Sequence, residues 1–284
     1  MSWIIAATLS AFLFGISGFL LKVGSHKKLS SPIMLLGLYL SGALIIYFGL
    51  LKDTAIQINA ITITFALIVG MGSYLGNAFL VKAYNTGPAS LTAPLVSLNV
   101  LLVVLMSSII YHEEIPLYKF YGISLILIAI SLLSFNFKNK LIKSKMWFVF
   151  VALTIIFIFM REGGLKISYE NGMNNYLILF AAYIIASGLA LGNLYLHKRK
   201  FPPIYNKTRS LAFGSIIGLF SAVGISLLAY AISKGPASIV IPIFSTRNFV
   251  IILLLSIVFK ERLSKLQWTS VCILLTGLTI ILCP

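Results

Sequence analysis

Long apolar runs separated by short polar connections make up most of this chain. Each run holds roughly 20 residues, which in a helix at about 1.5 Å per residue matches a hydrocarbon layer of about 30 Å. The pattern therefore predicts ten transmembrane helices. They are expected near Trp3–Val23, Pro32–Leu51, Ala60–Tyr84, Ala89–Tyr111, Leu117–Phe135, Met146–Tyr169, Asn175–Leu196, Leu211–Ser233, Ala237–Phe259 and Lys265–Pro284.

Composition places the whole chain in the membrane. Of its 284 residues, 60% are hydrophobic and only 10% are charged, whereas soluble domains carry about 25% charged residues. The mean hydropathy is +1.03. We therefore expect an all-α integral membrane protein with the lipid bilayer as its main surroundings and no soluble domain.

The chain contains an internal repeat. Gly87-Pro88-Ala89-Ser90 recurs as Gly235-Pro236-Ala237-Ser238, an offset of 148 residues (235 minus 87). The same offset pairs Gly76 with Gly224, Ala83 with Ala231, Pro94 with Pro242, Ser97 with Ser245 and Glu113 with Glu261. The sequence therefore predicts two domains, residues 1–140 and 141–284, each with five helices. Because five is odd, the second half must enter the membrane from the opposite side, which gives the inverted repeat typical of secondary transporters.

The basic residues are distributed unevenly between the two faces of the predicted bundle. The formal net charge is +16, and 16 of the 22 Lys and Arg fall in loops or helix ends on one face. The other face has four, Lys52, Lys119, Lys166 and Lys234. Under the positive-inside rule the lysine-rich face is cytoplasmic. Both termini are then expected on the extracytoplasmic side of the cell membrane, and no nucleic-acid partner is needed to explain the charge.

Catalytic and metal chemistry are poorly supported by the sequence. Cys272 and Cys283 show no metal-binding or redox spacing, and the six acidic residues include no two at ligand spacing inside the membrane. A membrane-embedded enzyme would need metal-binding carboxylates or a nucleophile with a base. We therefore expect no enzyme activity, no bound metal and no cofactor. A channel is also disfavoured, because its pore would need a ring of like groups.

Three charged residues lie deep inside predicted helices, away from the helix ends. Arg247 is about 15 Å deep in the ninth helix, and Arg161 and Glu162 are adjacent in the sixth. Groups at such depth are costly and usually functional. Glu162 either forms a structural salt bridge to one arginine or couples transport to protons. Two arginines against one carboxylate leave a positive charge that an anionic substrate group can neutralise through the planar guanidinium fork.

Polar and helix-breaking residues surround these charges. Asn99 is the repeat counterpart of Arg247, so they are expected to meet near the axis that relates the two halves. The predicted substrate-binding set is Arg161, Arg247, Asn248, Asn99, Ser97 and Ser245, and Glu162 is the predicted coupling residue. Pro94 and Pro242 each remove a backbone donor, and Gly163 and Gly164 allow close approach, so these four are predicted kink or gating positions. Simple packing kinks are the alternative.

Several motifs resemble the drug/metabolite transporter superfamily and its ten-helix EamA-type members. The resemblance covers essentially the whole chain. It rests on Phe14-Gly15 with Lys22, Ala83 with Gly87-Pro88-Ala89-Ser90, Ala93-Pro94-Leu95, Tyr111-His112-Glu113-Glu114, and in the second half Ala229-Tyr230-Ala231, Gly235-Pro236-Ala237-Ser238, Ile241-Pro242 and Phe259-Lys260-Glu261-Arg262-Leu263-Ser264. It implies helices from both halves around a central cavity, with the fifth and tenth helices peripheral and available to form a homodimer.

The resemblance also implies a transport activity. Members mostly export amino acids and other small metabolites, often driven by protons, and a basic residue near Arg247 is similar to the branch that moves sugar phosphates. We therefore expect a secondary-active transporter that exports a small metabolite bearing an anionic group by alternating access. The alternative is a flippase for an anionic lipid-linked sugar, which would use the same arginine and open its cavity to lipid.

Overall fold

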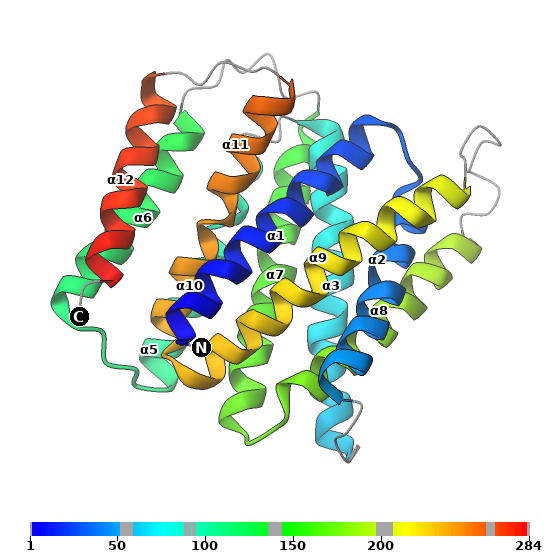
Figure 1. The fold of residues 1–284 in the computed structure, drawn as a ribbon, viewed down its shortest axis with the longest axis horizontal. Coiled ribbons are helices and arrows are strands. Elements are labelled where there is room, and N and C mark those ends of the chain that lie inside the picture. The colour runs from blue at the N-terminus through cyan, green and yellow to red at the C-terminus, as the bar shows by residue number, and fades with distance from the viewer. Residues whose placement is uncertain are drawn as a thin grey trace.

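The structure is a computed structural model that describes residues 2–51, 59–87, 92, 95–135, 144–196, 207–259 and 265–282. All regular structure in this part of the chain is helical (Figure 1). The helices are α1 (Trp3–His26), α2 (Ser31–Ile46) with the π-helical turn η1 (Tyr47–Leu51), α3 (Ala60–Thr86), α5 (Asn99–Ile110), α6 (Leu117–Phe135), α7 (Met146–Glu170), α8 (Asn175–Leu196), α9 (Lys207–Lys234), α10 (Ala237–Ser245), α11 (Arg247–Phe259) and α12 (Lys265–Leu282). The predicted all-α architecture is confirmed.

Seven helical segments in the described ranges are long and apolar enough to cross a membrane. They are α1, Ser31–Gly49, α3, α7, α8, α9 and the range Ala237–Val258, which covers α10 and most of α11. Helices also occupy the predicted fourth, fifth and tenth spans, as α5, α6 and α12. The chain is therefore a multi-pass membrane protein, and the count of ten spans stays a prediction.

Large apolar side chains cover the outside of the bundle. Phe12, Leu44, Phe148, Ile216 and Ile257 are each more than half exposed, and they come from five different helices. An apolar surface of this extent is stable only against lipid or another protein. The polar side chains instead gather inside the bundle, which places the chemistry of the protein there.

The helices pack in pairs that map onto themselves when the two halves are exchanged. Helix α2 of the first half packs on α9 of the second half, and correspondingly α8 of the second half packs on α3 of the first. Likewise α1 packs on α9 and α11, while α7 packs on α3 and α5. The peripheral helices α6 and α12 pack on each other, at one side of the molecule in Figure 1. The counterparts α1 and α7 run in opposite directions in the same view.

Each glycine of the repeated tetrapeptide packs against a tryptophan of the opposite half. A Cβ on Gly87 would lie 2.5 Å from the ring of Trp147, and a Cβ on Gly235 would lie 2.5 Å from the ring of Trp3. Glycine is therefore required at both turns by close approach. The two tryptophans are 144 residues apart (147 minus 3), so the first helices of the two halves follow a slightly shorter offset than the later ones.

The ninth predicted span is broken at its centre. Pro242 lies inside α10, which ends at Ser245, and α11 begins at Arg247. The break is a tight turn of i to i+3 hydrogen bonds, and the same bonds occur 148 residues earlier. They are Thr246 N to Ile243 O at 3.1 Å and Phe249 N to Thr246 O at 2.9 Å, with Leu98 N to Leu95 O and Leu101 N to Leu98 O both at 3.1 Å. Pro94 lies outside the described residues.

Candidate functional site

A single carboxylate lies at the centre of the bundle between two arginines. Glu162 of α7 is 0% exposed. Its Oε1 accepts a hydrogen bond from Nη2 of Arg161 at 2.9 Å and from Nη1 of Arg247 at 2.9 Å. Its Oε2 accepts from Nδ2 of Asn99 at 2.6 Å. Glu162 therefore pairs with both arginines, whereas the sequence suggested only one or the other.

This arrangement leaves the centre with an excess of positive charge. Arg161 and Arg247 are 3% and 6% exposed, and they share one carboxylate. The guanidinium carbon of Arg247 lies 4.1 Å from the ring centroid of Phe244, and that of Arg161 lies 5.1 Å from the ring centroid of Phe14. Cation–π contacts offset part of the cost of burying these charges. One formal positive charge stays uncompensated by Glu162.

Helix geometry places Arg247. Because α10 ends before it, Arg247 is the first residue of a new helix and its side chain extends toward α7. Glycines on α1 allow this close packing, since a Cβ on Gly15 would lie only 2.9 Å from the carbonyl oxygen of Arg247. A Cβ on Gly72 of α3 would lie 2.7 Å from the backbone nitrogen of Arg161. Small residues thus bring α1 and α3 against the two arginine-bearing helices.

The remaining predicted substrate-binding residues join the two helix breaks. The Nδ2 of Asn248 donates to Oγ of Ser97 in the first half and to the carbonyl oxygen of Ser245 at 3.0 Å. Asn99, two residues after Ser97, donates to Glu162. The structure therefore brings all six predicted substrate-binding residues and Glu162 to one region, although they come from positions 97 to 248 of the chain.

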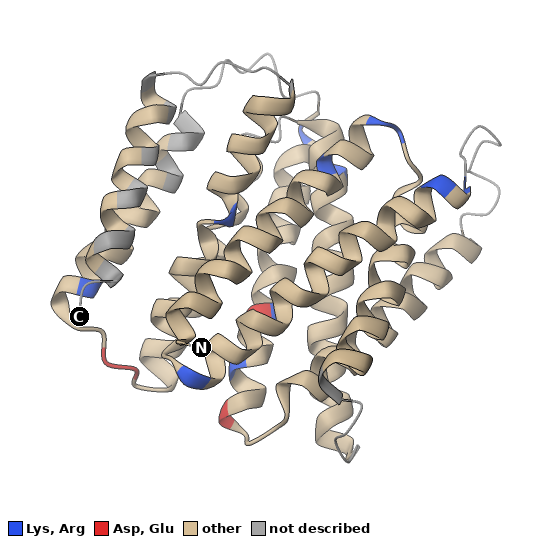
Figure 2. Ribbon diagram, viewed as in Figure 1, with Lys and Arg blue, Asp and Glu red and all other residues tan. Residues whose placement is uncertain are grey.

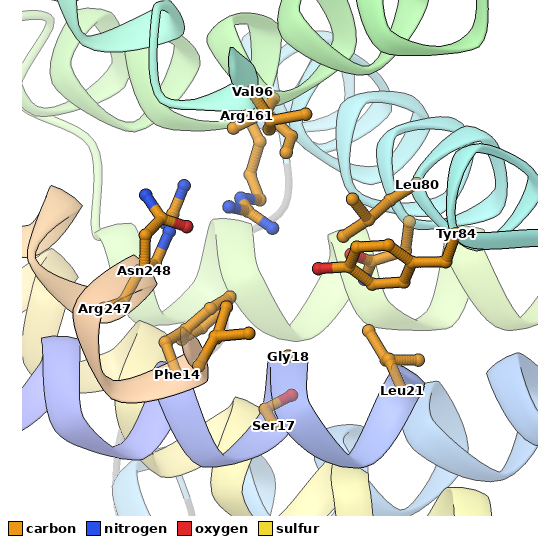
Figure 3. Close-up of a pocket in the computed structure, with 13 residues that line it drawn as sticks. Phe14, Ser17, Gly18, Leu21, Leu80, Tyr84, Val96, Arg161, Arg247 and Asn248 are labelled. Atoms are coloured by element: carbon orange, nitrogen blue, oxygen red, sulfur yellow. The ribbon is translucent and has the colours of Figure 1, made fainter. Parts of the chain in front are cut away.

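A cavity lies beside this charged centre. Its volume is about 40 Å³. Its lining consists of Phe14, Ser17, Gly18, Leu21, Asn77, Leu80, Tyr84, Val96, Ile158, Arg161, Arg247, Asn248 and Ile251. In Figure 3, Arg161 reaches into the cavity above Ser17, while Arg247 and Asn248 lie together at one side and the Tyr84 hydroxyl points toward them. Small-molecule pockets commonly measure about 300–1,000 Å³, so this cavity is smaller than a typical binding pocket.

The predicted residues divide into lining and supporting positions. Arg161, Arg247 and Asn248 line the cavity, whereas Glu162, Asn99, Ser97 and Ser245 do not line it and hydrogen-bond within the same polar cluster. Helix α7 continues without a break through Gly163 and Gly164, and a Cβ on Gly164 would lie 3.0 Å from Val69 of α3. These two glycines therefore serve close packing here, and their gating role stays a prediction.

Several lining residues were not singled out from the sequence. Ser17 and Gly18 are the counterparts of Arg161 and Glu162 at the offset of 144, so the charges are supplied by the second half alone. Asn77 is a polar residue in the apolar sequence of α3, and this contrast was a usable signal. Within the described residues no three His, Cys, Asp or Glu side chains gather as a metal site.

Comparison with known proteins assigns the family. The model of the EamA-like transporter family matches residues 1–135 and again residues 146–283. A solved structure described only as "Crystal structure of protein" aligns over 97% of this chain and 98% of its own, with a TM-score of 0.72 at 14% sequence identity, which shows a shared fold. No curated protein matches the chain. The two family matches span nearly all of the sequence, so the chain belongs to the EamA-like transporter family of multi-pass membrane transporters.

Proposed function

We propose that the protein moves a small metabolite bearing an anionic group across the membrane through the central cavity. The observation that carries this proposal is the pair of buried arginines that share Glu162 and line the cavity. A carboxylate or phosphate that enters the cavity meets a site with one excess positive charge. Arg247 offers a planar fork that fits such a group in two-point fashion.

Transport requires this small cavity to widen. The matched helix breaks at residues 97–98 and 245–246 lie where the two halves meet around the charged centre. Discontinuous helices of this kind form the binding sites of many transporters with repeated halves. We infer that α5 and α11 change their angle at these breaks, so that the cavity opens to one side of the membrane at a time.

Glu162 supplies a means of coupling to protons. While Glu162 is ionised, its Oε1 accepts hydrogen bonds from both arginines. Protonation removes that negative charge and frees the guanidinium groups for a substrate anion. The carboxylate and the substrate would then compete for the same arginines, which links proton uptake to the release or binding of substrate. This competition couples substrate binding to protonation of Glu162, and the export direction is the expectation that the family resemblance gives.

The proposal is tested by replacing Arg247. Purified protein in proteoliposomes would be assayed for uptake of a panel of labelled amino acids and organic phosphates. Arg247→Ala should reduce transport by at least about 100-fold, and Arg247→Lys should retain a fraction, because the charge survives but the fork is lost.

Arg209→Ala is the matched control, since Arg209 is an exposed residue near the start of α9. It should transport at the wild-type rate. Expression and folding of each variant would be compared before transport is scored. Full transport by the Arg247→Ala variant would contradict the proposal and assign Arg247 a structural role.

A further inference from the structure

Asn77 lies in the cavity wall, on α3, where the fold itself does not need a polar residue. It lines the cavity together with Arg161 and is 7% exposed. Its counterpart at the offset of 148 is Ile225 of α9, which is 0% exposed. The repeated architecture therefore accommodates an apolar side chain at this position. A polar group inside a membrane protein is costly unless a specific interaction compensates for it.

Hydrogen bonding fixes the orientation of the Asn77 amide. The hydroxyl of Tyr39 donates to the carbonyl oxygen of Ser73 at 2.7 Å. A phenol has one hydrogen, so the Tyr39 oxygen can only accept from Asn77, and the Nδ2 of Asn77 donates to it at 2.9 Å. The amide nitrogen is thus held toward Tyr39. The carbonyl oxygen Oδ1 is the atom left for the cavity, and no described residue donates a hydrogen bond to it.

The cavity therefore combines two opposite polar features. Arg161 and Arg247 provide donors with positive charge, while Asn77 provides an acceptor. Apolar side chains, including Leu80 and Ile158, line the same cavity. A molecule with only an anionic group would leave the Asn77 oxygen unpaired in a low-dielectric site, which is unfavourable. A molecule that also carries an N–H or O–H group satisfies both features.

We propose that Asn77, oriented by Tyr39, is a specificity-determining residue whose carbonyl oxygen accepts a hydrogen bond from an ammonium or hydroxyl group on the transported anion. This inference rests on the proposed function, because it concerns the same cavity. It assigns Asn77 direct contact with the ligand. Tyr39 is a positioning residue, since it acts through Asn77.

The repeat offers a matched control for the tyrosine. Tyr183 of α8 is the counterpart of Tyr39 (183 minus 39 is 144), and the two rings pack against each other with centroids 5.3 Å apart. Both side chains are buried. The Tyr183 hydroxyl pairs with Oγ of Ser221 at 2.9 Å, and its described hydrogen bonding does not involve Asn77. Removing either hydroxyl costs a buried hydrogen bond, and Tyr39→Phe also removes the bond that orients the Asn77 amide.

Binding of matched probes to the purified full-length protein tests this role. In the carboxylate series the probes are leucine, 2-hydroxy-4-methylpentanoate and 4-methylpentanoate, which differ only in the group on C2. In the phosphate series they are O-phosphoethanolamine and ethyl phosphate. We expect a donor-bearing probe to bind wild-type protein about tenfold more tightly than its donor-lacking reference in at least one series.

Asn77→Leu should abolish this preference by weakening the donor-bearing probe alone. Tyr39→Phe should reduce the preference, and Tyr183→Phe should leave it unchanged. If Asn77→Leu does not fold, the comparison of these two tyrosine variants tests the role of Asn77. The proposal is overturned by equal binding of both probe types to wild-type protein, by a preference that survives Asn77→Leu, or by failure of every donor-bearing probe to bind.

Failure of this inference can be told apart from failure of the proposed function. Donor-lacking probes that bind wild-type protein and lose affinity in Arg247→Ala would support the anion site even where Asn77 shows no preference. Binding that is insensitive to Arg247→Ala in every series would instead remove the anion site itself.

Discussion

In the proposed mechanism Glu162 couples transport to protons, because its Oε1 joins both arginines. Glu162→Gln keeps the shape and the bond from Asn99 but removes the negative charge. The arginines are then available to substrate at every pH. We expect substrate exchange to persist while transport loses its dependence on a pH gradient, measured in proteoliposomes with and without an imposed gradient. An unchanged pH dependence would reduce Glu162 to a structural partner of the arginines.

A second carboxylate, Glu113, ties the first half to the second. It lies in the connection between α5 and α6, and its two oxygens accept from the backbone nitrogens of Ala237 and Ser238 at 3.0 and 2.8 Å. Lys166 of α7 pairs with it at 2.6 Å and also with Glu170. Glu113 therefore caps α10, the helix that leads to Arg247, in the manner of an N-cap side chain supplied from elsewhere in the chain.

The pKa of Glu113 follows from these contacts. Burial alone would raise it, but the bonds from Lys166 and from the backbone nitrogens of Ser238 and Ala237 lower it below its usual value. A carboxyl whose folded pKa is lowered stabilises the fold above its unfolded pKa, and the contribution disappears as the pH falls through the folded pKa. Glu113 should therefore stabilise the protein fully at neutral pH and progressively less in acid.

Replacing Glu113 measures this contribution. Glu113→Gln should lower the free energy of unfolding by about 1–2 kcal/mol at pH 7, from the lost cap and ion pair. The difference from wild type should shrink as the pH falls through the lowered pKa. Thermal unfolding in detergent across a pH series provides the measurement, with the exposed neighbour replaced in Glu114→Gln as control. A difference that does not vary with pH would contradict this account.

Charge inside apolar helices made Arg161, Glu162 and Arg247 predictable, because such residues are rare and costly. What could not be predicted is that both arginines meet one oxygen, since adjacent residues on a helix project about 100° apart. The long Arg161 side chain nevertheless reaches Oε1 of Glu162. Asn77 was not predicted for a related reason, because its orientation depends on Tyr39 and Ser73, which only the folded chain brings to it.

At the scale of helices, α2 and α9 are joined by direct backbone contact. Gly214 and Gly218 of α9 are four residues apart and face α2. A Cβ on Gly214 would lie 2.0 Å from the carbonyl oxygen of Met34, and one on Gly218 would lie 2.3 Å from that of Leu38. Without a hydrophobic driving force between helices in lipid, such small-residue seams supply the close packing that holds helices together.

Filling this seam should destabilise the protein. Gly214→Ala places a methyl group against the backbone of α2, which cannot move aside as a flexible side chain can. We therefore expect a loss of about 1–3 kcal/mol in unfolding free energy. Gly188→Ala and Gly192→Ala on α8 are matched controls, since no atom of the described residues lies within 4 Å of a Cβ added there. They should be neutral or slightly stabilising. Equal thermal stability of Gly214→Ala and the controls would contradict the seam.

The break between α10 and α11 was predicted only in part from the sequence. Pro242 indicated a bend, yet α10 continues past it and ends at Ser245. Hydroxyl side chains also bond to the carbonyl groups of the last turn: Ser245 Oγ donates to the Pro242 carbonyl at 2.6 Å and Thr246 Oγ1 to the Ile243 carbonyl at 2.8 Å. The proline therefore weakens the helix, and the hydroxyls that follow fix where it ends.

For the whole molecule, charge separates the two ends of the bundle. Lys and Arg cluster at the upper end of Figure 2, where α1 and α3 end and α7 and α9 begin. The opposite end carries the described acidic residues other than Glu162, namely Glu113, Glu114 and Glu170. Both termini lie at that lower end in Figure 1. The described helices thus carry their basic residues mainly at the end where the sequence predicted them. Lys143 and Lys200, which the sequence also predicts on the cytoplasmic face, lie outside the described residues.

This separation sets the expected orientation in the membrane. Lysine and arginine near helix ends are retained on the cytoplasmic side, so the upper end should face the cytoplasm and both termini should lie outside. Single cysteines placed by Ser2→Cys and by Lys28→Cys, in a background with Cys272 and Cys283 replaced by serine, test the assignment in intact cells. An impermeant thiol reagent should label the first and spare the second until the membrane is permeabilised. The reverse labelling would show that the protein has the opposite orientation in the membrane. The transport cycle proposed for the cavity would then run in the opposite direction across the membrane, with the same arginines.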